Sequence, residues 1–161
     1  MNTQARFLDR TTPPHVATLI IMSGLAALSL NIFLPSLPAM ARDFGVDELR
    51  VNLVVSGYLA MTAAIQVVIG PISDRFGRRP VLLGAIAIFT LASLGAALTT
   101  DFTLFMAFRL MQAAIATAFT LSRAVVRDMV EPDKAASMIG YVTMGMSVVP
   151  MVGPAIGGLL D

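Results

Sequence analysis

Five long stretches of the sequence carry almost no charge, and their length constrains the fold more than any other feature. They cover residues 16–41, 51–73, 80–100, 102–122 and 135–160, with a single ionisable interruption at Arg109. A bilayer core about 30 Å thick takes roughly 20 residues of helix to cross, so each stretch is long enough to span. The sequence therefore predicts an all-α membrane protein with five transmembrane helices, at about 16–38, 51–72, 80–99, 102–124 and 136–160.

The composition agrees with a lipid environment and argues against several classes of function. Hydrophobic residues make up 57% of the 161 residues and charged residues 13%, whereas soluble domains carry roughly 25% charged residues. The formal charge of +1 comes without any basic block, which argues against a nucleic-acid partner. With no cysteine and one histidine, a metal site or thiol- or histidine-based catalysis is not expected. We therefore predict a protein that is not an enzyme and has no cofactor.

Basic residues are divided unevenly between the two ends of the predicted spans. If the N-terminus is cytoplasmic, Arg6, Arg10, Arg75, Arg78, Arg79, Arg123, Arg127 and Lys134 lie inside, and only Arg42 and Arg50 lie outside. Lysine and arginine in short loops favour the cytoplasmic side, so this orientation is predicted, with Asp161 at the outer face. The alternative of a cleavable signal peptide is disfavoured, because its apolar region is only ~7–15 residues long.

The turn between the second and third stretches carries an ordered set of glycine, aspartate and arginine residues. The set is Gly70, Asp74, Arg75, Gly77, Arg78 and Arg79. Gly70 permits close helix approach, Asp74 can pair with arginine, and Gly77 suits a left-handed turn. A sharper hypothesis pairs Asp128, at the end of the fourth stretch, with Arg75 or Arg78. The alternative for the loop is a plain positive-inside turn, and the alternative for Asp128 and its neighbours is a set of interface anchors.

Arg109 is the one ionisable residue deep inside a predicted span, eight residues past Asp101, or roughly 12 Å along the helix. An intramembrane arginine faces the protein interior or a water-filled cavity and marks a substrate or proton path by default. Gln112 shares its helical face, and Ala113, Ala116 and Thr120 continue a stripe of small residues for helix packing. The alternative, a side chain that reaches back to the outer interface, is weak at this depth.

Two further sets of residues stand out in the fifth and first stretches. The fifth stretch is rich in glycine and proline, at Gly140, Gly153, Pro154, Gly157 and Gly158. This pattern predicts a bent helix that packs closely on a neighbouring helix, and the alternative is a kinked helix without a specific partner. Asn31 in the first stretch can hydrogen-bond a substrate or another helix, and both possibilities stay open.

These patterns together resemble the major facilitator superfamily. The pattern Gly-x-x-x-Asp-Arg-x-Gly-Arg-Arg from Gly70 is similar to its loop signature, and Arg109-Leu110-Met111-Gln112-Ala113 is similar to its fourth-helix motif, with Ala113 in place of glycine. The glycines of the fifth stretch resemble the antiporter motif of drug:proton exchangers, although Val149 stands where that motif has glycine. The segment from Leu30 to Pro38 resembles Bcr/CflA-type drug-resistance transporters, with Asn31 in place of their aspartate.

The resemblance implies proton-coupled efflux of drugs or other small amphipathic molecules from the bacterial inner membrane, driven by the proton gradient. It implies Arg109 as the proton-linked group, Asn31 and Gln112 as residues of the substrate cavity, and the loop signature as part of a cytoplasmic gate. Residues 1–161 would then be a partial N-terminal domain that stops before the sixth helix. We expect such a chain to be inactive until the second half, or a second copy, completes it. The competing hypothesis is a non-transporting membrane subunit or assembly protein, which gives no reason for Arg109.

Overall fold

The structure is a computed structural model that describes residues 15–129 and 131–160, with the backbone alone at 132, 133, 150 and 157–160. Helices account for the secondary structure of these residues, and no strand occurs among them. This confirms the predicted all-α fold. Arg6, Arg10 and Asp161, which were assigned above to the two membrane faces, lie outside the described residues.

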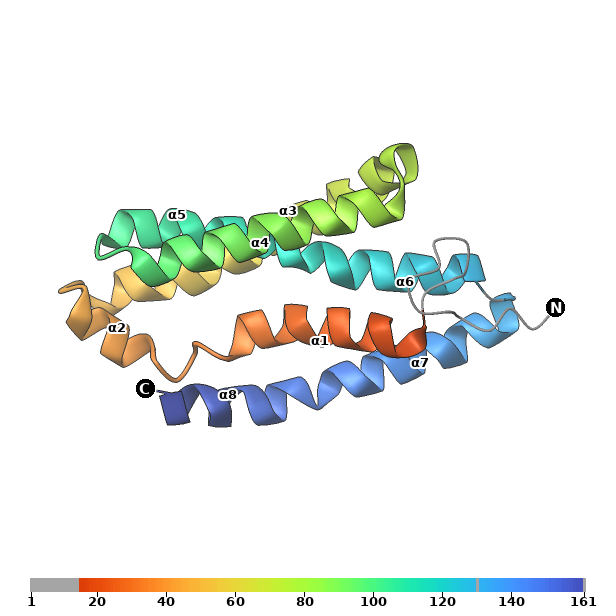
Figure 1. Ribbon diagram of the computed structural model, residues 1–161. Helices are drawn as coiled ribbons and strands as arrows, with labels where there is room; N and C mark the ends of the chain where they lie inside the picture. The colour runs from red at the N-terminus through yellow and green to blue at the C-terminus, as the bar shows by residue number, and fades with distance from the viewer. Residues whose placement is uncertain (1–14, 130, 161) are drawn as a thin grey trace.

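The helices run back and forth as an antiparallel bundle (Figure 1). Their bounds are α1 Val16–Asn31, α2 Leu37–Asp43, α3 Glu48–Phe76, α4 Arg78–Leu98, α5 Phe102–Gln112, the 3₁₀ turn η1 Ala113–Ala116, α6 Thr117–Met129, α7 Pro132–Ser147 and α8 Val149–Leu160. Among the described residues, Glu48–Phe76, Arg78–Leu98, Phe102–Met129 and Lys134–Ile156 are long and apolar enough to cross a membrane. The apolar helix α1 has 16 residues and is shorter than these.

The first apolar stretch folds as two helices, not as one helix reaching residue 38. Helix α1 ends at Asn31, and the chain turns through residues 32–36 before α2 begins at Leu37. Pro35 explains the break, because its ring would collide with the carbonyl group of Asn31 in a continued helix and it has no N–H to donate. Pro38 is tolerated because it occupies the first turn of α2.

Short polar side chains mark where the other helices begin. Asp47 precedes α3 and its Oδ1 accepts a hydrogen bond from the Arg50 N–H at 3.2 Å. Asp101 does the same for α5, accepting from the Leu104 N–H at 2.8 Å. Each cap satisfies a backbone donor that the first turn of a helix leaves free. Between α3 and α4 the chain reverses at Gly77, whose φ of +90° is in the region that favours glycine.

The bundle has two layers joined by the segment that carries Arg109. Helices α3, α4 and α5 form one layer, α1, α7 and α8 form the other, and α6 runs between them (Figure 1). The path through α5, η1 and α6 packs on both layers. Ala113 and Ala116, two of the small residues predicted to allow close packing, are at most 1% exposed, as is Ile115, and the third, Thr120, is half-buried. This burial places Arg109, one turn earlier, inside the bundle.

Candidate functional site

Arg109 lies in the last turn of α5 and is buried, with 6% of its surface exposed. Its Nη2 donates a hydrogen bond to the backbone carbonyl of Ser29, near the end of α1, at 2.6 Å. Its Nη1 donates to Oε1 of Gln112, and Gln112 Nε2 in turn donates to Ser93 Oγ of α4 at 3.0 Å. The arginine therefore ties together helices from both layers. Charge-assisted bonds of this kind are the stronger class of protein hydrogen bond.

Two aromatic rings cover the Arg109 guanidinium. Its Cζ is 3.7 Å from the ring centroid of Phe33, in the turn after α1, and 4.5 Å from that of Tyr58 on α3. The Tyr58 hydroxyl also donates to Ser29 Oγ at 3.3 Å. A cation over an aromatic face gains about 0.5–1 kcal/mol when exposed and about 2 kcal/mol or more when desolvated. The two rings thus provide some of the electrostatic stabilisation that a carboxylate gives to other buried arginines.

No carboxylate pairs with Arg109 among the side chains that the structure describes. Its Nε is also buried and lacks a hydrogen-bond partner within the same residues. Buried charges are normally paired, because removing an isolated charge from water is costly. Arg109 is held instead by a carbonyl, an amide and two rings.

Of the two predicted cavity residues, only Gln112 joins Arg109. The prediction that both share one helical face is confirmed by their hydrogen bond. Asn31 instead turns its amide back along α1, where Nδ2 donates to the Ala27 carbonyl at 2.7 Å. Its side chain is half-buried. The observed bond is structural, but it lies within one helix and does not join two.

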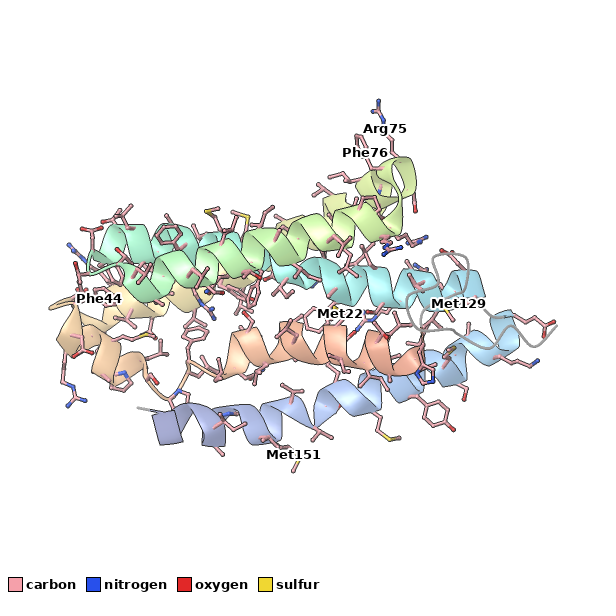
Figure 2. The ribbon with its side chains drawn as sticks, viewed as in Figure 1. Met22, Phe44, Arg75, Phe76, Met129 and Met151 are labelled. Atoms are coloured by element: carbon pink, nitrogen blue, oxygen red, sulfur yellow. The ribbon has the colours of Figure 1, made fainter. Side chains whose placement is uncertain are left out.

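The turn between α3 and α4 carries the predicted cluster of charges. Arg78 pairs through Nε with Asp128 of α6 at 2.7 Å and through Nη2 with Asp74 at 3.3 Å. Of the two arginines considered for Asp128, the structure selects Arg78. Arg75 and Phe76 project away from the bundle at the tip of this turn (Figure 2), with the Arg75 Cζ 5.5 Å from the Phe76 ring.

Gly70 does not have the predicted role of allowing close helix approach within the described structure. A Cβ built at this position meets nothing within 4 Å. Its carbonyl accepts a hydrogen bond from the hydroxyl of Ser73 at 2.8 Å, and Ser73 is the buried residue of the pair.

The glycines of the last apolar stretch divide into those that touch α1 and those that do not. A Cβ at Gly153 would lie 3.3 Å from Leu28 Cδ1 and 3.5 Å from Asn31 Cβ, so α8 packs closely on the end of α1. Gly140 has nothing within 4 Å of a Cβ. The stretch is also interrupted between α7 and α8, just before Pro150, as expected for the residues preceding a proline. Pro154, Gly157 and Gly158 continue α8 without a further break.

The family model of the Major Facilitator Superfamily matches residues 19–161 of this sequence. The chain belongs to this superfamily. The apolar helices described above make this chain a multi-pass membrane protein. The resemblance drawn from the motifs is thereby confirmed over nearly the whole sequence.

Several relatives are named for resistance to drugs. The chain is 38% identical to the chloramphenicol resistance protein of Pseudomonas aeruginosa over 150 residues, which is 90% of this chain and 36% of that protein. It is 36% identical to multidrug resistance protein D of Escherichia coli, covering 89% of this chain and 36% of the relative. For multidrug resistance protein MdtM of Salmonella typhimurium the identity is also 36%, over 96% and 38% of the two chains. The major facilitator chain described here spans a little over a third of these relatives.

Four residues that complete the Arg109 site in this major facilitator chain are not marked by any of the sequence patterns. They are Ser29, Phe33, Tyr58 and Ser93. One signal was available, since a buried arginine requires partners and Tyr58 is one of two tyrosines in the whole sequence. Which of the many serines and phenylalanines meet the arginine depends on how four helices pack, and local patterns do not contain that information.

Proposed function

We propose that this chain is part of a proton-coupled exporter of drugs or other small amphipathic molecules, with Arg109 as its proton-linked group. The observation that carries the proposal is a buried arginine without a carboxylate partner among the described side chains. Intramembrane charges are costly and are retained where a substrate or proton path uses them. Because hydrogen bonds and ring contacts hold Arg109, a change of charge nearby can alter its partners without breaking an ion pair.

The charge distribution supports the orientation of the proposed transporter. Six basic residues lie at the end of the bundle that holds the α3–α4 turn, namely Arg75, Arg78, Arg79, Arg123, Arg127 and Lys134. Only Arg42 and Arg50 lie at the opposite end, near α2 and the start of α3. The positive-inside rule makes the first end cytoplasmic. The pairs of Arg78 with Asp74 and Asp128 then hold α3, α4 and α6 together at the cytoplasmic gate.

The relatives named for drug resistance are more than twice as long as this chain. Secondary transporters work by rocking one repeat against another around a central site. We therefore propose that transport requires the other half of the transporter, or a second copy of this chain, in addition to the lipid bilayer and a small-molecule substrate. The isolated chain would not transport.

The test is efflux of a fluorescent cationic dye from bacteria that express this chain or the chain extended by the reading frame after Asp161. We expect efflux only from the extended form, and we expect a proton uncoupler to abolish it. Arg109→Ala should remove the efflux, whereas Arg50→Ala should retain it, because Arg50 is exposed and paired only with Asp47 at 3.7 Å.

The outcomes separate the possible functions. Efflux that persists with Arg109→Ala in the extended form contradicts the proposed role of Arg109. Efflux from the short chain alone would show that copies assemble into a complete pathway. If neither form exports a dye or a panel of antibiotics, the alternative of a non-transporting membrane subunit is favoured.

A further inference from the structure

The break after α1 leaves helix carbonyls without their usual partners. The last four carbonyl groups of a helix have no N–H one turn ahead to bind them. At this end, the Ile32 N–H reaches Leu28 O at 2.9 Å and the Leu34 N–H reaches Asn31 O at 3.4 Å. Neither bond uses the carbonyl of Ser29, which receives Nη2 of Arg109 at 2.6 Å. A side chain from α5 therefore supplies a donor that the broken helix lacks.

The charge of Arg109 suits this position. Aligned peptide dipoles give a helix a partial negative charge at its C-terminus, so a cation there is stabilised. Helix α1 has no basic residue in its own last turn. Arg109 provides the cation from another helix, at a buried position inside the bundle where it is 6% exposed.

Tyr58 contacts both members of this cap. Its ring centroid lies 4.5 Å from the Arg109 Cζ, and its hydroxyl donates to Ser29 Oγ at 3.3 Å. Tyr58 is 2% exposed, so its ring is fixed by the surrounding helices. Phe33, from the turn itself, contributes a second ring centroid 3.7 Å from the Arg109 Cζ. The guanidinium is thus held by two rings as well as by the carbonyl that it caps.

We propose that Tyr58 is a positioning residue whose ring, with that of Phe33, holds Arg109 against the open end of α1. Arg109 then acts as the C-terminal cap of the broken helix and fixes the turn at residues 32–36. Loss of either the ring of Tyr58 or the charge of Arg109 loosens the same turn. The consequence for transport rests on the function proposed above, whereas the capping itself does not.

Thiol labelling can test this coupling because the sequence contains no cysteine. Ser36→Cys places a reporter in the turn without removing a cap, since the Ser36 side chain makes no capping bond to α2. Thr100→Cys, at an exposed position between α4 and α5, serves as the matched control. The rate of maleimide labelling is measured on the purified chain in lipid nanodiscs, so no transport activity is needed.

We expect Tyr58→Leu to raise the labelling rate at residue 36 by roughly 5- to 30-fold, with no change at residue 100. Tyr58→Phe keeps the ring and should stay within about twofold of the parent rate. Arg109→Gln should raise the rate as Tyr58→Leu does, and combining the two should add nothing further, because both remove the same cap.

Three results would overturn the proposal. They are an unchanged rate with Tyr58→Leu, equal acceleration by Tyr58→Phe and Tyr58→Leu, and additive effects of Tyr58→Leu and Arg109→Gln. Tyr58→Met, which is unbranched and fills the space flexibly, replaces Tyr58→Leu if that variant loses its helical circular dichroism. Failure of dye efflux in the extended protein would count against the proposed function and leave these labelling rates unaffected.

Discussion

At the scale of single residues, Arg109 shows how a charge is accommodated in an apolar bundle. A conventional ion pair is absent among the described side chains, and the guanidinium instead meets Ser29 O, the amide of Gln112 and the rings of Phe33 and Tyr58. Each contact is neutral, so the site keeps its positive charge.

Gln112 offers a direct test of the network at this scale. Replacing it with leucine removes the acceptor for Arg109 Nη1 and the donor to Ser93, which leaves a buried charge less well satisfied. We expect Gln112→Leu to lower the free energy of unfolding by about 1–2 kcal/mol, since hydrogen bonds to charged groups contribute more than the average interhelical bond in membranes. Titration of the purified chain with SDS measures this.

The neighbouring variant Met111→Leu is the control, because Met111 is 48% exposed and outside the network. It should change the free energy of unfolding by less than about 0.5 kcal/mol. Equal effects of the two substitutions would show that Gln112 contributes no specific bond to stability.

At the scale of elements, glycine sets how closely α1 and α7 approach. A Cβ built at Gly145 would lie 2.6 Å from Ile20 Cγ2, well inside van der Waals contact. Gly145 and Gly153 thus mark two points where the last apolar stretch packs closely on α1. An apolar groove lined by residues of α1, α7 and α8 includes both points. On the other side of this stretch Met151 points away from the bundle (Figure 2).

Two glycines on the same helix allow a matched comparison. Gly145→Ala must displace the Ile20 side chain or α1 itself, which costs about 1–3 kcal/mol of overpacking against a gain of about 1 kcal/mol in helix propensity. Gly140→Ala gains the same free energy of helix propensity, and the new Cβ meets no atom within 4 Å. We expect the first variant to unfold at lower SDS than the second. If Gly145→Ala is the more stable of the two, α1 and α7 do not pack as closely as described.

At the scale of the whole molecule, the two ends of the bundle differ in chemistry. The end with the α3–α4 turn carries most of the arginines, three of them in Arg75, Arg78 and Arg79. At the other end, Phe44 packs against Phe102 and Phe105 with ring centroids 5.8 and 5.2 Å apart, and it lies far from Arg75 and Phe76 (Figure 2). This polarity is what the proposed orientation in the membrane depends on.

The orientation is testable with one cysteine at each end. Phe76→Cys, at a position 64% exposed in the α3–α4 turn, should react with a membrane-impermeant maleimide only after the cells are permeabilised. Thr100→Cys, between α4 and α5, should react in intact cells, because six basic residues favour a cytoplasmic location for the first end. The reverse pattern of labelling would exclude a cytoplasmic N-terminus.

The sequence by itself determined the class of the fold. Long runs without charge require helices in lipid, because no other local structure satisfies every backbone group of a single segment there. Prolines, and aspartates that cap the first turn of a helix, likewise set where helices begin and end, as Asp47 and Asp101 do at the start of α3 and α5. The exception is the first stretch, where hydropathy predicted one span and Pro35 ended the helix at Asn31.

Only the tertiary structure decided which residues meet. Arg109 was recognisable from its depth in the sequence, and Gln112 from its spacing of three residues, because helical geometry alone brings that pair together. Ser29 and Tyr58 reach Arg109 from other helices, and Phe33 reaches it from the turn after α1. Their approach depends on how α1, α3 and α5 are rotated and packed against one another, which arises from side-chain contacts summed over the whole bundle and not from any local pattern.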